Sequence, residues 1–89
     1  MPTVIFTPAL RRFLRVPEAR VGGATVGAAL AAVFAEHPAL RGYVLDDQGA
    51  LRRHVAVYVN GAAVRDRAGL GDAVGPRDEI YVFQALTGG

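Results

Sequence analysis

Short runs rich in apolar and β-branched residues predict β-strands at the start of the chain. The first run covers residues 3–7 and ends at Pro8, which cannot continue a hydrogen-bonded ladder. A second run, residues 15–21, ends at two glycines and contains Pro17, which confines a strand to a sheet edge. We therefore expect these two strands to pair as a hairpin.

Residues 26–37 have the spacing of an amphipathic helix. Their larger apolar side chains fall on one helical face, namely Val26, Leu30, Val33 and Phe34. Alanines, the best helix formers, fill the positions between them, Thr25 is placed to cap the N-terminus and Pro38 ends the pattern. For residues 38–51 the sequence predicts one short helical turn followed by a loop.

The second half of the chain predicts three more strands. Residues 54–59 alternate strongly, and Asn60-Gly61 after them is the strongest short hairpin signal, so residues 62–65 should return as a brief strand. Turns rich in glycine follow, and residues 79–86 form the last strand. Residues 87–89 are then expected to be a flexible tail that ends in two glycines.

One main helix and these short strands predict a single α+β domain over residues 1–86. The β-grasp arrangement fits this order. It is a mixed four- to five-stranded sheet with the helix packed on one face and the last strand beside the first at the centre. The far face of the sheet is then left uncovered.

Alternation along residues 54–59 and 79–86 separates two sets of side chains. The set expected to face the helix is Val55, Val57, Val59, Ile80 and Val82. Tyr58, Tyr81 and Phe83 then point to the uncovered face, where three aromatic residues predict a partner-binding surface. The alternative is that Tyr43 or the segment 38–52 folds over them.

Composition narrows the functions open to such a fold. An 89-residue chain buries only about 60–65% of its unfolded surface, which leaves little room for an enclosed catalytic pocket. The lack of cysteine excludes disulfides, thiolate zinc sites and cysteine nucleophiles. No apolar run approaches the ~18 residues of a membrane span, and residues 1–3 begin no signal peptide, so we expect a cytoplasmic protein without a membrane partner.

All ten basic residues are arginine. Because no lysine titrates first, a net charge of +2 suffices for a pI near 9.7, so the pI does not indicate a nucleic-acid-binding field. The lack of lysine fits either GC-rich coding or avoidance of self-acylation. Two clusters, Arg11-Arg12 with Arg15 and Arg52-Arg53, can be solvated side chains, an acidic-partner surface or, third, an RNA contact. Only Phe13 lies near them to stack on bases.

No pattern predicts catalysis or a bound metal or cofactor. The spacing G-x-G-x-x-x-G over residues 69–75 is one residue longer than the dinucleotide fingerprint, so these glycines predict turns. His37 and His54 lie in separate elements without carboxylates at ligand spacing. Asp46-Asp47 and Asp78-Glu79 are sequence neighbours whose side chains point apart, which indicates solvated turns. We therefore expect a protein that is not itself an enzyme.

Gly88-Gly89 is the remaining feature. Glycines have no Cβ, so a backbone ending in them can thread a narrow enzyme channel and bring its carboxylate close to another molecule's phosphate. The last five residues, if extended, reach about 17 Å. A disordered tail would explain flexibility but not the absence of both side chains.

Several segments together resemble the ubiquitin-like sulfur-carrier family of ThiS and MoaD, the small subunit of molybdopterin synthase. They are Val4-Ile5-Phe6 followed by Ala9-Leu10-Arg11, the helix after Thr25, residues 55–61, Asp78-Glu79-Ile80 and Leu86-Thr87-Gly88-Gly89. The resemblance covers essentially the whole chain. The long link from Pro38 to Arg53 is similar to that of the longer carriers that serve cysteine biosynthesis, whereas Gln84-Ala85-Leu86 departs from the family's usual proline-rich approach.

The resemblance implies a carrier whose Gly89 is adenylated by a ubiquitin-activating-type adenylyltransferase that uses ATP and magnesium. A sulfur donor then forms a thiocarboxylate, which a biosynthetic enzyme of the cysteine, molybdopterin or thiamine type accepts. Gly88 would be the slim approach segment, and Leu86 and Thr87 would join the aromatic residues in the partner surface. Two alternatives are the small subunit of a molybdopterin synthase complex and a ubiquitin-like protein modifier.

Overall fold

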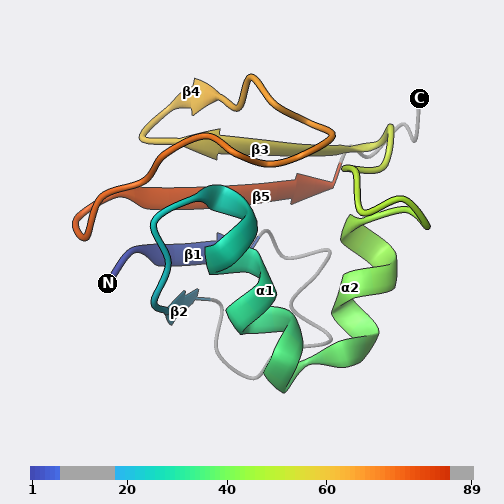
Figure 1. Ribbon diagram of the computed structural model, residues 1–89, viewed down its shortest axis with the longest axis horizontal. Coiled ribbons are helices and arrows are strands. Elements are labelled where there is room, and N and C mark those ends of the chain that lie inside the picture. Colours follow the sequence, from blue (N-terminus) through green and yellow to red (C-terminus); the bar gives the residue numbers. More distant parts are fainter. Residues whose placement is uncertain (7–17, 85–89) are drawn as a thin grey trace.

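The computed structural model describes residues 1–6 and 18–84 (Figure 1). Its elements are β1 (Thr3–Phe6), β2 (Glu18–Arg20), α1 (Val26–Glu36), α2 (Pro38–Val44), β3 (Val55–Val59), β4 (Ala62–Ala63) and β5 (Glu79–Gln84). This is the predicted order, with the helix α2 in the place of the predicted helical turn. The Ala9-Leu10-Arg11 motif, the outer residues predicted for three strands and the predicted tail lie outside the described residues.

The five strands form one mixed sheet in the order β2-β1-β5-β3-β4. β1 and β5 run parallel at the centre, and the other neighbours are antiparallel. The last strand therefore lies beside the first, and the predicted β-grasp arrangement is confirmed. β5 pairs with β1 over residues 79–82 and with β3 over residues 80–84, so each of its residues is paired on at least one side.

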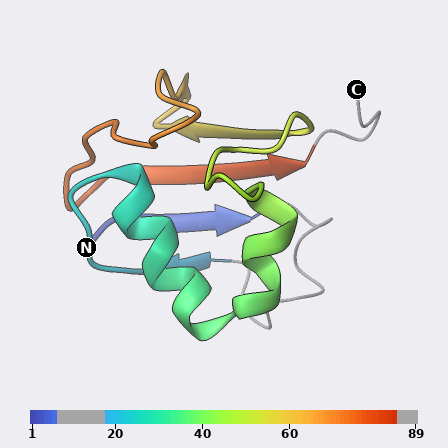
Figure 2. The ribbon, with the colours of Figure 1, turned by 45° about the vertical axis from the view of Figure 1, so that its right-hand side comes forward.

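Both helices lie on the same side of the sheet (Figure 2). α1 begins where predicted, because the Thr25 hydroxyl oxygen accepts a hydrogen bond from the amide of Ala28 at 3.1 Å. The core between helices and sheet is apolar, and its fully buried larger side chains are Phe6, Leu30, Leu40, Ile80, Val4, Val26, Val33, Val44, Val55, Val57 and Val82. Ala29 is also fully buried, and its small size lets α1 lie close to the strands.

α2 is longer than the single turn that the sequence predicts. Pro38 ends α1 but occupies the first turn of α2, where a proline is favourable because its missing amide hydrogen would have no helical partner. Leu40 and Val44, four residues apart on one helical face, are both fully buried. Tertiary packing of these two side chains therefore stabilises a seven-residue helix despite the weak helix former Gly42.

The β3–β4 hairpin has the predicted turn, with positive φ at both Asn60 (51°) and Gly61 (88°). The amide side chain of Asn60 also accepts a hydrogen bond from the amide of Glu79 at 2.9 Å and donates one to Asp78 at 2.8 Å. β4 is shorter than the predicted residues 62–65, and beyond it Val64 is buried and donates its amide hydrogen to the carbonyl of Val57. The two hydrogen bonds of the Asn60 side chain connect the hairpin to the start of β5.

Carboxylates organise the connection between β4 and β5. Asp66 accepts hydrogen bonds from the amides of Gly69 at 2.7 Å and Gly71 at 3.1 Å. Asp72 accepts them from the amides of Arg65 and Asp66, both at 2.9 Å. The turn interpretation of the glycines is confirmed, because their amides donate within the chain and do not form an open phosphate cradle.

Acid should weaken this connection. Hydrogen bonds from Gly69 and then Gly71 hold the pKa of Asp66 below its ordinary 3.8, and those from Arg65 and Asp66 lower the pKa of Asp72 likewise. Since both pKa values are lower in the folded state, the contribution of these carboxylates to stability is complete above about pH 5 and is lost as pH falls through the folded values. We expect the melting temperature, followed by circular dichroism, to fall below pH 4.

Two substitutions test whether these carboxylates cause the fall in melting temperature below pH 4. Asp72→Asn removes one acceptor oxygen, so it should lower the melting temperature at pH 7 and flatten the fall below pH 4. Asp47→Asn is the control, because its exposed carboxylate accepts no hydrogen bond from another described residue. Identical acid profiles for these two variants would contradict the assignment.

Candidate functional site

The strand register brings the predicted aromatic residues together on the face of the sheet opposite the helices. Tyr58 lies directly across from Tyr81, and Phe83 follows Tyr81 on the same face of β5. The ring centroids of Phe83 and Tyr58 are 5.6 Å apart at an interplanar angle of 86°, and those of Phe83 and Tyr81 are 6.2 Å apart at 22°. These are favourable edge and stacked geometries, so the three rings form one cluster.

The cluster is accessible within the described part of the chain. Phe83 is 40% exposed, and Tyr58 and Tyr81 are half-buried. Tyr43, which the sequence offers as a cover, belongs to α2 on the opposite side of the sheet and is itself 39% exposed. Leu45, in the segment 38–52 that was the other predicted cover, is buried in the core between the helices and the sheet. The predicted common aromatic face is confirmed, and its role in binding a partner stays a prediction.

Ile5 is a further apolar residue on this face, in addition to the three predicted aromatic residues. Ile5 lies beside Tyr81 in the parallel pair and beside Glu18 in the antiparallel pair. Its neighbours Val4 and Phe6 are fully buried, so the alternation of β1 was the signal that could have placed Ile5 on the open side. The apolar surface therefore spans three strands.

Charged residues border the apolar surface toward the start of β5. Glu18, Arg20 and Glu79 are exposed, and Arg20 and Glu79 pair with Thr3 from its two sides. The hydroxyl of Tyr81 donates a long hydrogen bond, 3.4 Å, to the Glu79 carboxylate. An apolar centre with a polar border is the usual anatomy of a protein interface.

β5 ends beside this surface. Phe83 is followed by Gln84, the last described residue, which pairs with Val55 at the start of β3. The predicted partner residues Leu86 and Thr87 and the predicted reactive terminus, Gly88 and Gly89, lie outside the described residues. The order along the chain nevertheless places them immediately after the strand that carries Tyr81 and Phe83.

The other candidate groups take structural roles. His37 ends α1, and its amide donates to the carbonyl of Val33 at 3.0 Å. His54 lies in the tight turn before β3. Asp46 accepts from the amides of Gln48 and Ala50, and Asp78 accepts from the amide of Gly75 at 2.7 Å, which holds its pKa below the ordinary value. The predicted turn is confirmed for Asp46-Asp47, whereas in the second pair only Asp78 belongs to a turn, because Glu79 begins β5.

Within residues 1–6 and 18–84, no cluster of three or more histidine, aspartate or glutamate side chains could hold a metal ion. No helix in that part is long and apolar enough to cross a membrane.

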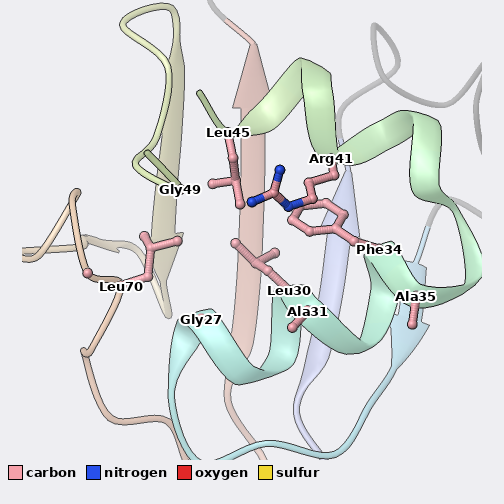
Figure 3. Close-up of a pocket in the computed structure, with 10 residues that line it drawn as sticks. Gly27, Leu30, Ala31, Phe34, Ala35, Arg41, Leu45, Gly49 and Leu70 are labelled. Atoms are coloured by element: carbon pink, nitrogen blue, oxygen red, sulfur yellow. The ribbon is translucent and has the colours of Figure 1, made fainter. Parts of the chain in front are cut away.

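A hollow of about 450 Å³ lies on the helix side of the sheet (Figure 3). It is bounded by α1, α2 and two turns, and its lining residues are Gly27, Leu30, Ala31, Phe34, Ala35, Arg41, Leu45, Gly49, Gly69 and Leu70. Arg41 is the only charged side chain among them and extends across the opening in Figure 3. Among the described residues that line it, none carries a carboxyl, imidazole, hydroxyl or thiol group.

Comparison with known proteins gives concordant results. The model of the ThiS family matches residues 11–89. The small archaeal modifier protein 1 of Haloferax volcanii is 44% identical over 68 residues, which are 76% of this chain and 74% of that protein. A chain in the crystal structure of the BexX/CysO complex of Amycolatopsis orientalis has a TM-score of 0.87 to this one at 28% identity, and the match covers both chains completely. CysO of Mycobacterium tuberculosis has a TM-score of 0.84 at 27% identity, covering 97% of this chain and all of that one.

Proposed function

The chain belongs to the ThiS family, and we propose that it is a sulfur carrier whose reactive group is the carboxylate of Gly89. Its relatives are ubiquitin-like small modifier and carrier proteins. The observation that carries the proposal is that the family match extends through Gly88 and Gly89. These two residues come after β5 in the chain, the strand that carries Tyr81 and Phe83.

The proposed chemistry needs no catalytic side chain from this chain. A carboxylate is a poor electrophile, so an activating partner joins its oxygen to the α-phosphorus of ATP, with magnesium, and releases pyrophosphate. Sulfide supplied by a donor then attacks the acyl carbon, AMP leaves, and a thiocarboxylate and a proton remain. The thiocarboxylate sulfur is a strong nucleophile that a biosynthetic enzyme can accept. The absence of an acid–base pair in the described hollow is compatible with this division of labour.

The aromatic surface supplies the docking contact in this proposal. Phe83, Tyr81 and Tyr58 offer rigid rings with polar hydroxyls, which are typical anchors of protein interfaces. Docking on this face holds the start of the tail while the tail enters the partner. The adenylyltransferase, the sulfur donor and the acceptor enzyme are the proposed partners. We propose an acceptor of the cysteine-biosynthesis type, in line with the long link between Pro38 and Arg53.

A protein modifier is the second candidate, because the Haloferax relative is named a modifier protein. In that reaction a substrate lysine amine attacks the activated acyl carbon and forms an isopeptide bond. Trypsin cleaves after Arg77, the last basic residue of the chain, so digestion of cellular proteins would leave residues 78–89 attached to lysines if this candidate is correct. A synthase subunit would instead co-purify as a stoichiometric complex with its catalytic partner.

Intact-mass measurement tests the carrier proposal. The full chain is incubated with its adenylyltransferase, ATP, magnesium and sulfide, and we expect first the mass of the acyl adenylate and then the exchange of one oxygen for sulfur. Deleting Gly89 should abolish both products. Gly42→Ala is the matched control, since a Cβ at this exposed helical position meets no atom within 4 Å. A wild-type chain that gains neither mass would refute the proposal.

A further inference from the structure

A tight turn beside the end of β5 presents an arginine. The amide of Val55 donates to the carbonyl of Arg52 at 3.0 Å, so Arg53 and His54 occupy the two corner positions of this turn. Val55 is also the residue that pairs with Gln84. Arg53 therefore lies two residues before Val55, the residue opposite the end of β5.

Two other arginines fix this turn in place. The Nη2 of Arg67 donates to the carbonyl oxygens of Arg52 at 2.8 Å and Val55 at 2.6 Å, the two ends of the turn. The Nε of Arg52 donates to the carbonyl of Gly42 at the end of α2, at 2.7 Å. Arg52 and Arg67 thus stabilise the backbone that carries Arg53.

Arg53 itself is exposed, and its side chain forms no hydrogen bond or ion pair with any of residues 1–6 and 18–84. In the preceding loop, the carboxylate of Asp46 is used by the amides of Gln48 and Ala50. The backbone of this turn needs no ordering on binding, and a planar guanidinium can bind a carboxylate of another molecule through two parallel hydrogen bonds.

We infer that Arg53 contacts acidic side chains at the mouth of the partner channel that admits the tail. The inference rests on the proposed function. Five residues follow Gln84, and in an extended form they carry Gly89 about 17 Å away from the end of β5. In this inference the tail is extended inside the partner, so the nucleotide phosphate that reacts with Gly89 lies far from Arg53 and the counter-charge belongs to the protein surface around the entrance. Opposite charges at such a rim mainly raise the association rate.

Charge reversal at two equivalent turns tests this inference. Arg53→Glu and Arg77→Glu each change the net charge from +2 to zero. Arg77 is exposed in the Gly75–Asp78 turn at the start of β5, about 17 Å along the strand from its end. We expect Arg53→Glu to lower kcat/KM for activation about five- to tenfold at low salt and to approach wild type at 0.5 M salt. Arg77→Glu should stay within about twofold of wild type.

The outcomes separate this inference from the function on which it rests. If the wild-type chain is not activated at all, the proposed function fails. If the wild type is activated and the two variants behave alike, the role of Arg53 is refuted. A salt-independent loss, or a change confined to the KM for ATP, would also refute it, because the first indicates misfolding and the second a nucleotide contact. Circular dichroism melting checks that both variants fold.

Discussion

Phe83→Ala is expected to lower kcat/KM for activation about 30-fold, the equivalent of about 2 kcal/mol for a central interface anchor. Phe83 contacts both tyrosines of the cluster and is 40% exposed, so its removal takes the middle ring out of the surface. The fold should persist, because the side chain lies outside the core between sheet and helices. Adenylate formation over a range of carrier concentrations measures the effect.

Tyr43→Ala is the matched control for this prediction. Tyr43 is also aromatic and is 39% exposed, but it belongs to α2 on the other side of the sheet. We expect its kcat/KM to remain within about twofold of wild type. Equal losses for Tyr43→Ala and Phe83→Ala would contradict a docking role for the open face.

Phe6→Ala should destabilise the fold by about 3–5 kcal/mol. Phe6 is fully buried on the central strand β1, where it pairs with Val82 of β5. Domains of this size are stable by only about 5–13 kcal/mol, so the substitution should remove a large part of the stability of the fold. Urea unfolding followed by circular dichroism gives the free energy directly.

The neighbouring residue separates core packing from surface contact. Ile5 lies on the opposite face of the same strand and is only half-buried, so Ile5→Ala should cost less than half as much stability. Ile5→Ala should also lower kcat/KM for activation, because Ile5 lies on the apolar surface. Phe6→Leu should change activation only as far as it changes the stability of the fold. A loss for Phe6→Ala no larger than that for Ile5→Ala would show that the sheet side facing the helices is not the core.

Alternation along the chain predicts much of the fold because the strands are buried on one face only. Tyr58, Tyr81 and Phe83 fall on the open face for this reason, and Thr25 caps α1 because an oxygen acceptor is needed before the first turn. Such signals are local, so a single sequence contains them. The parallel pairing of β1 with β5 follows from the small number of ways in which one helix can cover this sheet.

Features that depend on long-range contacts were not predictable in the same way. α2 exists because Leu40 and Val44 reach a core whose other residues are distant in sequence. Arg67 stabilises a turn that ends 12 residues before it, and no local pattern distinguishes this arginine from a solvated one.

The central position of β5 also has a mechanical consequence. A force drawing on the chain beyond Gln84 acts along β5, which is hydrogen-bonded to β1 on one side and β3 on the other. These hydrogen bonds lie across the direction of pull, so they are loaded together in shear and do not open one at a time. A pull on the chain beyond Gln84 is therefore resisted by the pairing with both neighbouring strands at once.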